Sequence, residues 1–362
     1  MLIVSQTSYS QEDYEEVMAG ICEDLYDVPE PIKEYSGISK LTHGVSSWCR
    51  KNHVADGLDV GIDFGSMGVG LEVKTPVTKW AALRVGVDWM PAFTVPMSFN
   101  LNTFAGGVAT NNFQKIADRL YNLTGIEMDE TVHMNGRGSM VNFKLMVDIY
   151  PVPSNRHWHL TAGFFAGTSM VGKALNTREE KPTLVGLNIY NRAYEYFTNL
   201  ESIFDVPLGG GAYMDPELVM EVQERFERYG RMGVRIGYFD RDIGMDPETG
   251  QPIYKKGDPY IMEPAPDGTI SARAFVNHFK PYIGAGYATD IDRKGKWHFG
   301  VDLGVLFWGG APDVINHDYV TGKDINFTKD LVNIRGRVGD YMKIIKSFPV
   351  FPVLAFKFSY SI

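Results

Sequence analysis

Eight short stretches of this chain alternate apolar and polar residues, and many of the polar positions carry full charges. In one stretch Leu83, Val85 and Val87 alternate with Arg84 and Asp88. Because successive side chains of a β-strand point to opposite faces, each stretch forms a strand with one apolar side and one charged side. The apolar side faces either a soluble core or lipid, and this choice decides the fold.

The residues at the strand ends favour lipid. Trp80, Trp158 and Trp297 each follow a short polar turn, and membrane–water interfaces select aromatic rings at such positions. The sequence has no run of about eighteen apolar residues that would make a transmembrane helix, whereas a barrel strand needs only about 9–11 residues. We therefore expect an all-β fold, an antiparallel transmembrane β-barrel, with these three tryptophans as membrane-interface anchors.

The alternation predicts eight strands. They cover Leu58–Phe64, Val69–Lys74, Leu83–Trp89, Asn142–Tyr150, Trp158–Phe165, Phe279–Tyr287, His298–Phe307 and Pro352–Tyr360. Residues Met232–Phe239 and Thr269–Val276 also alternate, so a ten-strand barrel, or a hairpin above the rim, is the alternative. Short turns of such barrels lie on the periplasmic side and long loops lie outside, which places both ends of the barrel in the periplasm.

The segment before the first strand has a different character. Residues 1–10 are interpreted as a signal-peptide remnant, because Ser8-Tyr9-Ser10 resembles a small-x-small cleavage site; an ordinary cytoplasmic N-terminus is the alternative. Residues 11–56 are expected to form a helical segment in the periplasm or the lumen, and residues 57–362 the barrel with its loops. Cys22 and Cys49 either pair in an oxidising periplasm or are two buried thiols.

Three connections are far longer than turns, at about 99–139, 172–268 and 309–347. An apolar stripe from Phe113 to Tyr121 predicts a helix in the first, and a second helix is expected from about Thr183 to Phe204. A third begins at Asp215-Pro216, an N-cap followed by proline, and stops at Gly230. Loops of this length are too long to be mere connectors, so we expect them to fold into an extracellular cap.

The charged sides of the strands face the barrel lumen. An eight-stranded barrel is only wide enough for its own side chains, and unpaired charge inside it is costly. Six acids oppose five bases, so we interpret the set as structural lumen charges that pair with one another and plug the barrel. They are Asp59, Asp63, Glu72, Lys74, Arg84, Asp88, Lys144, Asp148, Lys280, Asp302 and Lys357.

The strands together resemble a family of Gram-negative outer-membrane β-barrel proteins, most of them uncharacterised. The matching segments are Asp59–Glu72 (DVGIDFGSMGVGLE), Asn142–Gly163 (NFKLMVDIYPVPSNRHWHLTAG), Phe279–Tyr287 (FKPYIGAGY), Gly300–Trp308 (GVDLGVLFW) and Pro349–Tyr360 (PVFPVLAFKFSY). The resemblance implies a barrel that the outer-membrane assembly machinery inserts into the cell outer membrane, and it implies no activity. That machinery reads a closing strand with alternating apolar residues, a pattern that Phe356, Phe358, Tyr360 and Ile362 follow.

One pair of residues is a candidate for catalysis. His298 and Ser359 both point inward near the periplasmic end, on strands that can be neighbours, as a Ser/His hydrolase requires; a hydrogen bond in the lumen is the alternative. Acids alternate over Asp240–Glu248 as in a calcium loop, but the glycine and the final glutamate of that motif are missing, so we expect a solvated turn. We predict no metal and no cofactor.

These patterns favour an outer-membrane barrel with a plugged lumen and a structural or binding role. Its loop cap would contact a protein partner, a surface glycan, or lipopolysaccharide and other outer-membrane lipids. A small channel or lipid transporter is one alternative, and an outer-membrane lipid hydrolase is another. The formal net charge of −9 argues against a nucleic-acid partner, because no dense Lys/Arg stripe is present in the sequence.

Overall fold

The computed structural model describes residues 57–152 and 154–362. The expected signal-peptide remnant (1–10), the N-terminal segment (11–56) and both cysteines lie outside the described residues.

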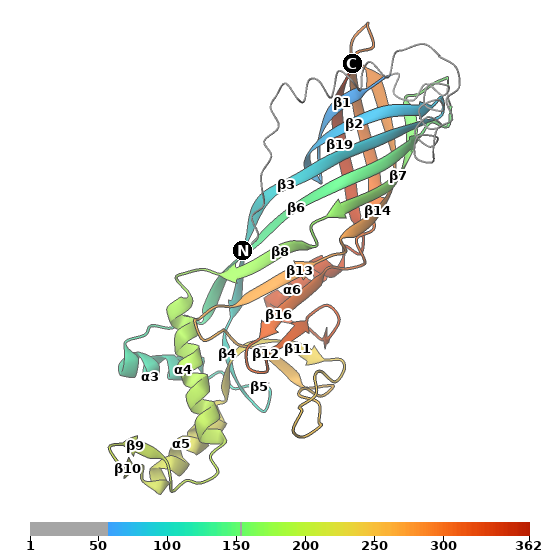
Figure 1. The fold of residues 1–362 in the computed structure, drawn as a ribbon. Helices are drawn as coiled ribbons and strands as arrows, with labels where there is room; N and C mark the ends of the chain where they lie inside the picture. Colours follow the sequence, from blue (N-terminus) through green and yellow to red (C-terminus); the bar gives the residue numbers. More distant parts are fainter. Residues whose placement is uncertain (1–56, 153) are drawn as a thin grey trace, which may run out of the picture. The chain divides into compact units, whose positions relative to one another are not determined.

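Eight strands close into an antiparallel barrel (Figure 1). They pair in the order β1–β2–β3–β6–β7–β14–β15–β19, and β19 pairs back with β1. Their bounds are β1 Asp59–Gly65, β2 Gly68–Thr78, β3 Ala81–Asn100, β6 Thr131–Ile149, β7 Trp158–Gly167, β14 Phe279–Asp290, β15 Trp297–Leu306 and β19 Phe351–Ser361. The predicted fold class is confirmed, with eight strands and not ten in the barrel.

The two ends of the barrel differ in the length of their connections. At one end, named the termini end here, β1 begins and β19 finishes; one short turn contains Trp80, and short turns precede Trp158 and Trp297. At the opposite end, named the cap end, Gly65–Gly68 is a tight turn and the other three connections are long. Long and short connections thus fall at opposite ends as the sequence predicts, apart from this one tight turn.

Two barrel strands continue beyond the barrel into the cap (Figure 1). β3 and β6 stay paired from Ala81↔Ile149 to Asn100↔Thr131, with a bulge between Met90 and Phe93. The predicted loop of about residues 99–139 begins where β3 ends but finishes too late, because the chain returns to a strand at Thr131. The predicted strand Leu83–Trp89 ends too early, because β3 continues to Asn100. The bulge explains the error, since it shifts the alternation of β3 by one residue and hides the continuing strand.

The extended part of β3 and β6 begins a second region of sheet, named the upper sheet here. β8 (Met170–Asn176) pairs with the upper half of β6, and β13 (Ser271–Phe275), β16 (Asp313–Asp318) and β17 (Lys323–Asn326) follow in order. The alternating segment at 269–276 is thus in the upper sheet, outside the barrel.

A separate sheet completes the β-structure of the cap. Its central strand is β11 (Arg231–Phe239), the other alternating segment that the sequence offered as a barrel strand. Its neighbours are β12 (Pro259–Met262), β4 (Asn102–Ala105), β5 (Val108–Ala109) and β18 (Leu331–Val332), and a small hairpin of β9 (Pro207–Gly209) and β10 (Ala212–Tyr213) stands apart from it.

Four helices of the described residues pack in the cap, and three of them are predicted. They are α3 (Phe113–Thr124), α4 (Lys181–Thr198), α5 (Pro216–Tyr229) and α6 (Gly336–Lys346). The Asp215 carboxylate accepts a hydrogen bond of 2.8 Å from the Glu217 amide, and Gly230 ends α5 at a φ of 78°, as its sequence predicts. α4 ends at Thr198, before the predicted Phe204, and α6 has no side-chain cap that would reveal its start. None of the helices in the described part of the chain is long and apolar enough to cross a membrane.

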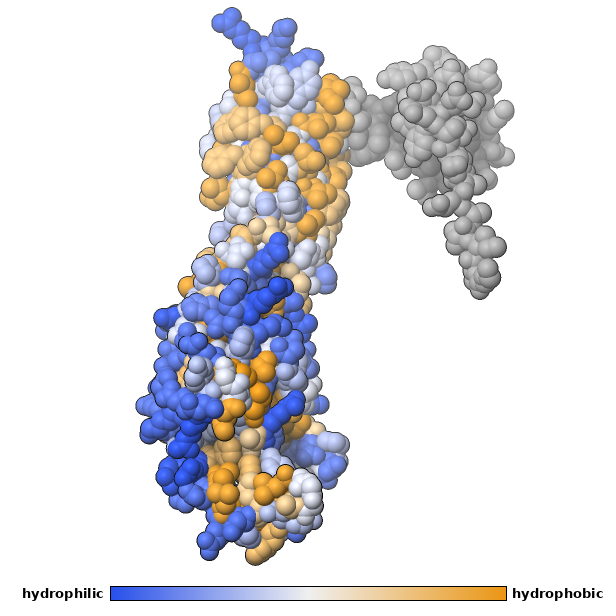
Figure 2. All heavy atoms as spheres, turned by 90° about the vertical axis from the view of Figure 1, so that its left-hand side faces the viewer, coloured by the Kyte–Doolittle hydropathy of each residue, from blue (hydrophilic) through white to orange (hydrophobic). Residues whose placement is uncertain are grey.

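The barrel and the cap carry different surfaces. Exposed apolar side chains surround the barrel, among them Ile62, Leu71, Phe143, Leu303 and Phe356. Figure 2 shows this hydrophobic band and, below it, a largely hydrophilic cap with smaller apolar patches. The cap has its own apolar core where α3, α4 and α6 meet the two sheets, whereas the barrel interior is largely charged.

Candidate functional site

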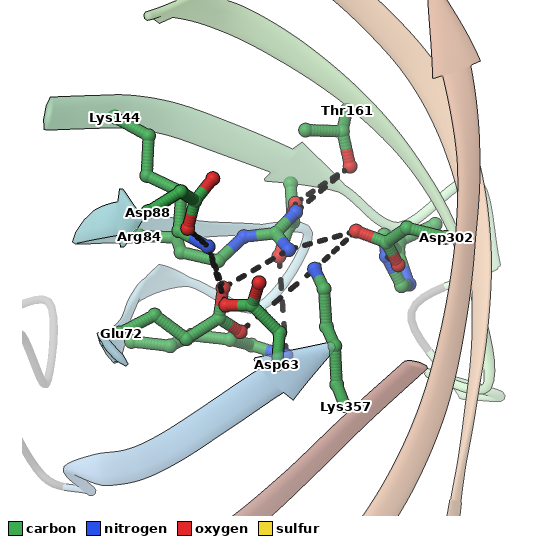
Figure 3. Close-up of polar contacts among 11 residues, drawn as sticks. Asp63, Glu72, Arg84, Asp88, Lys144, Thr161, Asp302 and Lys357 are labelled. Atoms are coloured by element: carbon green, nitrogen blue, oxygen red, sulfur yellow. Dashed lines mark hydrogen bonds and ion pairs between the residues drawn. The ribbon is translucent and has the colours of Figure 1, made fainter. Parts of the chain in front are cut away.

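The barrel lumen holds a network of charges centred on Arg84 (Figure 3). The Arg84 guanidinium is 3% exposed and donates to Asp302 at 2.8 Å and to Asp148 at 2.5 Å. Its Nη1 also lies 3.6 Å from Glu72 Oε2. These carboxylates come from β15, β6 and β2, so one side chain ties three strands together across the lumen.

Lys144 of β6 is the second centre of the network. Its Nζ lies 2.6 Å from Asp63 Oδ2, 2.8 Å from Asp88 Oδ1 and 3.0 Å from Glu72 Oε2. Glu72 therefore links the Lys144 cluster to Arg84. Because all these groups are buried, each needs the others to replace the water it has lost.

Asp302 closes the network on the opposite wall of the barrel. It accepts hydrogen bonds from Lys357 of β19 and, at 3.0 Å, pairs with His159 of β7. Lys74 lies at the margin, 4.0 Å from Asp148 Oδ2. In all, five carboxylates meet four cations and the His159 imidazole, all within the lumen.

Two of the eleven predicted lumen charges lie outside this network. Asp59 Oδ1 accepts a hydrogen bond from Ser361 at 2.5 Å and is in no ion pair within the described residues. Lys280 is 0% exposed, but its Nζ donates to Asn142 Oδ1 at 2.8 Å and to the Thr168 carbonyl at 2.9 Å. The expected pairing of Lys280 with a carboxylate is therefore wrong, because its strand position lies beyond the acids, nearer the cap end.

Inward glycines make room for the charged side chains. A Cβ atom on Gly70 would approach Asp88 Oδ1 to 2.2 Å, and one on Gly286 would approach Asp302 Oδ1 to 2.2 Å. The alternation of charged residues with glycine in the barrel strands thus has a packing cause, since a narrow lumen cannot hold a side chain at every inward position.

An apolar plug fills the lumen on the cap side of the charges. Met67, Met140, Met146, Phe165 and Tyr282 are buried together there, joined by Leu306 and Val353. The Phe165 and Tyr282 rings meet edge to face at 5.6 Å. Between the plug and the ion network, side chains of the described residues line a small cavity of about 20 Å³.

The lumen opens instead at the termini end, into a cavity of about 360 Å³. Its wall includes the two catalytic candidates, His298 and Ser359. The hydroxyl that bonds His298 Nε2 is however that of Ser361, at 2.7 Å, and Asp290 Oδ1 lies 2.7 Å from Nδ1. Sequence reasoning missed Ser361 because residues 359 and 361 share one face of β19. The register places Ser359 opposite His298, but the ring reaches diagonally to Ser361.

This chain of Ser361, His298 and Asp290 differs from a hydrolytic triad in one respect. The Ser361 oxygen is also 2.5 Å from Asp59 Oδ1. A hydroxyl has one proton and an ionised carboxylate can only accept, so the proton that Ser361 donates to Asp59 is not donated to His298 Nε2. A nucleophilic serine needs the opposite arrangement, in which the ring accepts its proton.

A second cavity lies in the cap, between the upper sheet and α6, with a volume of about 340 Å³. We call it the cap groove. Phe93, Val95, Ile344 and Phe348 line it and remain exposed, so its apolar wall is open to the outside. Its floor carries small residues from neighbouring strands, including Gly136, Gly172, Ala174, Ala272 and Ala274.

The sequence singled out two further places. Trp80, Trp158 and Trp297 all lie exposed at the termini end, where Trp158 and Trp297 contact Tyr287 and Tyr360 at ring distances of 5.0 Å. In Asp240–Glu248 the Asp246 carboxylate accepts from the amides of Glu248 and Thr249, which lowers its pKa and forms a turn. No group of three or more His, Cys, Asp or Glu suited to a metal ion occurs among the described residues.

Comparisons with known proteins give no family. No family model matches the chain, and no curated protein matches it. Among solved structures it is similar to CarO2 of Acinetobacter baumannii, with 12% identity, a TM-score of 0.33, and coverage of 84% of this chain and 98% of that one. For CarO of the same organism the values are 12%, 0.34, 84% and 96%. At these scores, the fold rests on the strand pairing described above.

Proposed function

We propose that this protein is an outer-membrane β-barrel that anchors a binding cap at the cell surface and does not conduct. The observation that carries the proposal is the reversal of polarity in the barrel, which is apolar outside and charged inside (Figures 2 and 3). Water outside would make such a surface costly, whereas lipid removes that cost and leaves the charges to pair inside. Aromatic rings at both barrel ends, such as Trp158 and Trp89, support the same placement.

The closing strand supports insertion by the outer-membrane assembly machinery. Leu354, Phe356 and Phe358 of β19 are exposed on the outside of the barrel, and Lys357 between them reaches the ion network. The alternation that this machinery would read is therefore also the pattern that the folded barrel requires. Short turns at the termini end favour a periplasmic position for that end and a surface position for the cap.

Insertion is tested by cell fractionation and gel migration. We expect the protein in the outer-membrane fraction, with an unheated sample that migrates differently from a boiled one, because a closed barrel resists detergent until it is heated. A soluble protein whose migration does not depend on heating would contradict the proposal.

The plugged lumen is tested by planar-bilayer recording. The ion network and the methionine-rich plug leave no continuous water path, so we expect no single-channel steps from the purified protein. As a positive control, Met140→Gly with Met146→Gly removes two plug side chains, and conductance in that variant would show that the assay detects an opened lumen. Steps of similar size in the unaltered protein would favour the channel alternative.

Binding is proposed at the cap groove. Its volume of about 340 Å³ lies within the roughly 300–1,000 Å³ of small-molecule sites, and its lining is apolar, which suits an acyl chain. A protein, glycan or lipopolysaccharide partner of the cap would use the same exposed rim of Phe93, Val95, Ile344 and Phe348 or its surroundings.

Gly172 offers a way to test the groove. A Cβ there would lie 3.5 Å from Ala274 Cβ and 3.9 Å from the Arg137 carbonyl oxygen, both ordinary van der Waals distances, so the site has room for a larger side chain. Gly172→Leu should fill the groove and weaken binding of a dansyl-labelled fatty acid, read by its fluorescence, while Gly172→Ala should leave the groove open. Equal binding by both variants and the unaltered protein would show that the acyl chain does not enter the groove.

The hydrolase alternative stays testable. We expect the unaltered protein to show no phospholipase or deacylase activity above a blank, because Ser361 donates its proton to Asp59. The variants Ser361→Ala and His298→Ala should then give the same blank level. An activity in the unaltered protein that disappears in both variants would overturn this view.

A further inference from the structure

Three basic side chains lie side by side on the outer face of the upper sheet. Arg137 of β6 is directly opposite Lys173 of β8, and Lys173 is directly opposite Arg273 of β13. Paired residues of neighbouring strands point to the same face, with Cβ atoms about 4.5–5.5 Å apart. Like charges in that arrangement repel one another, so the row, named the cation row here, is destabilising unless an anion lies on it.

The described residues supply little counter-charge to the cation row. Asp324 Oδ2 lies 3.7 Å from Arg273 Nη2, and that is the one carboxylate of the described residues within ion-pair distance of the row. Arg137 and Lys173 are exposed. The uncharged neighbours at the two ends of the row, Thr94 of β3 and Ile315 of β16, do not change this balance.

The cation row lies on the same face as the hydrophobic band. In β6 the odd-numbered residues point outward along the whole strand, so Arg137 is on the side of Val141 and Phe143. Trp89, exposed and paired with Val141, lies where an interfacial ring would be. Arg137 is four residues further along β6; at about 3.4 Å per residue and a tilt of about 35–45°, that is roughly 10 Å towards the cap.

At that height the side chains of the cation row can reach the headgroups of the membrane. The hydrocarbon core is about 30 Å thick and the whole bilayer about 40–45 Å, so headgroups extend about 5–8 Å beyond the core on each side. Starting from the ring of Trp89, the backbone of the cation row therefore lies about 2–5 Å beyond the headgroup layer, and its long Arg and Lys side chains reach back towards that layer. Anions at this level are the phosphates of lipids, which guanidinium groups bind with two hydrogen bonds and lysine binds as a point charge.

We propose that Arg137, Lys173 and Arg273 form a binding site for the phosphate groups of an outer-leaflet lipid. The inference rests on the proposed membrane insertion, and it adds which ligand chemistry the outside of the cap recognises. The phosphate neutralises the mutual repulsion of the three cations, and the adjoining hydrophobic band of the barrel holds the acyl chains of the same lipid. Arg137, Lys173 and Arg273 also contribute to the lining of the cap groove. Their side chains point to the opposite face of the sheet from those of Ala174 and Ala272, so the phosphate site lies on the outer face.

The test uses the full chain in nanodiscs of uncharged lipid, titrated with lipid A that carries phosphates. The variant Arg137→Gln/Lys173→Gln/Arg273→Gln removes the cation row. A matched control, Arg225→Gln/Arg228→Gln/Lys343→Gln, removes three exposed cations from α5 and α6 and changes the net charge equally. Dephosphorylated lipid A and inorganic phosphate are titrated in parallel, and every variant is first checked for heat-dependent gel migration.

We expect the row variant to bind phosphorylated lipid A on the order of 100-fold more weakly than the unaltered protein, at roughly a factor of five for each cation. The control should bind within about twofold, and dephosphorylated lipid A should bind the unaltered protein as weakly as phosphorylated lipid A binds the row variant. Added salt should weaken binding by the unaltered protein and the control, but not by the row variant.

Three results would overturn the inference. Equal affinity of the row variant and the unaltered protein would show that the phosphates do not bind here. Inorganic phosphate binding as tightly as lipid A would make a soluble anion the ligand. A protein that does not insert into the membrane at all would remove both this inference and the proposed function. An unaltered protein that inserts normally but binds phosphorylated and dephosphorylated lipid A equally would remove the inference alone.

Discussion

The barrel half and the cap half of β6 have opposite polarity on each face of the strand. Even-numbered residues point inward along the whole strand; in the barrel they include Lys144 and Asp148, and in the cap they include Met134 and Val132. On the outer face the order is opposite, with Phe143 and Val147 on the barrel and Arg137 on the cap. One continuous strand thus has a charged interior in one half and an apolar interior in the other.

The difference teaches that the surroundings, and not the strand, decide what lies inside. Lipid is as apolar as leucine, so a barrel in a membrane gains nothing by hiding apolar side chains, and its interior is left to groups that satisfy each other. In the cap, water lies outside, and burial of apolar area supplies the stability as in any soluble domain. The change falls near Met140 and Val141, beside the bulge of β3.

The largest effect should follow from removing the centre of the barrel network. Arg84→Met leaves Asp148, Asp302 and Glu72 buried without their main cation, and breaking a buried pair costs about 3–5 kcal/mol. We expect the free energy of unfolding of the refolded protein in detergent to fall by that amount. It is measured from urea unfolding curves, with gel migration as the readout of the folded fraction. Lys329→Met, which removes an exposed partner of Asp313, should cost at most about 1 kcal/mol. Equal losses would mean that the lumen charges do not hold the barrel together.

The cap should respond instead to the loss of apolar volume. Leu187 of α4 is fully buried in the cap core, so Leu187→Ala should destabilise the cap by about 2–5 kcal/mol. Limited proteolysis should then cut the cap sooner while the barrel keeps its heat-dependent migration. Ile189→Ala on the exposed side of the same helix is the control, with little expected change. Loss of barrel migration in Leu187→Ala would contradict the separation of the two interiors.

A pair of leucines tests the outer faces. Leu145 faces outward at the middle of the barrel part of β6, and Leu175 faces outward on β8 in the cap. Leu145→Arg should cost about 2–4 kcal/mol in a bilayer, since a charge there must enter lipid. Leu175→Arg should stay within about 0.5 kcal/mol, because the same charge meets water. Refolding yields in lipid vesicles and urea midpoints measure both, and similar costs would mean that the barrel does not span a membrane.

The same contrast explains how far the sequence predicts this molecule. In the barrel every second residue meets lipid, so alternation alone reveals all eight strands and the inward direction of residues such as Arg84 and Asp302. The partners of those charges depend on how side chains meet across the lumen, so alternation does not predict that Lys280 donates to Asn142 or that His298 contacts Ser361 in place of Ser359. In the cap, long-range packing decides the structure, so α5 with its clear caps is predictable, whereas α6, the cap groove and the cation row are not.

The smallest effect concerns a charged pair inside the cap. Glu263 is buried, and burial raises the pKa of its carboxyl although Arg231, 3.1 Å from Oε2, partly opposes that rise. A raised pKa means that the folded cap holds the proton more tightly than the unfolded chain. Glu263 therefore stabilises the cap most below the unfolded pKa near 4.5, and this contribution is lost as the pH rises through the higher folded value.

The titration of Glu263 can be measured through the pH dependence of cap stability. Between pH 5 and pH 8, we expect protection of the cap against protease to decline slightly as pH rises, and Glu263→Gln should remove that slope because glutamine does not titrate in this range. Asp313→Asn, which changes an exposed pair with Lys329, is the control and should keep the slope. If Glu263→Gln and the unaltered protein show the same pH dependence, the burial of this carboxyl does not couple to cap stability.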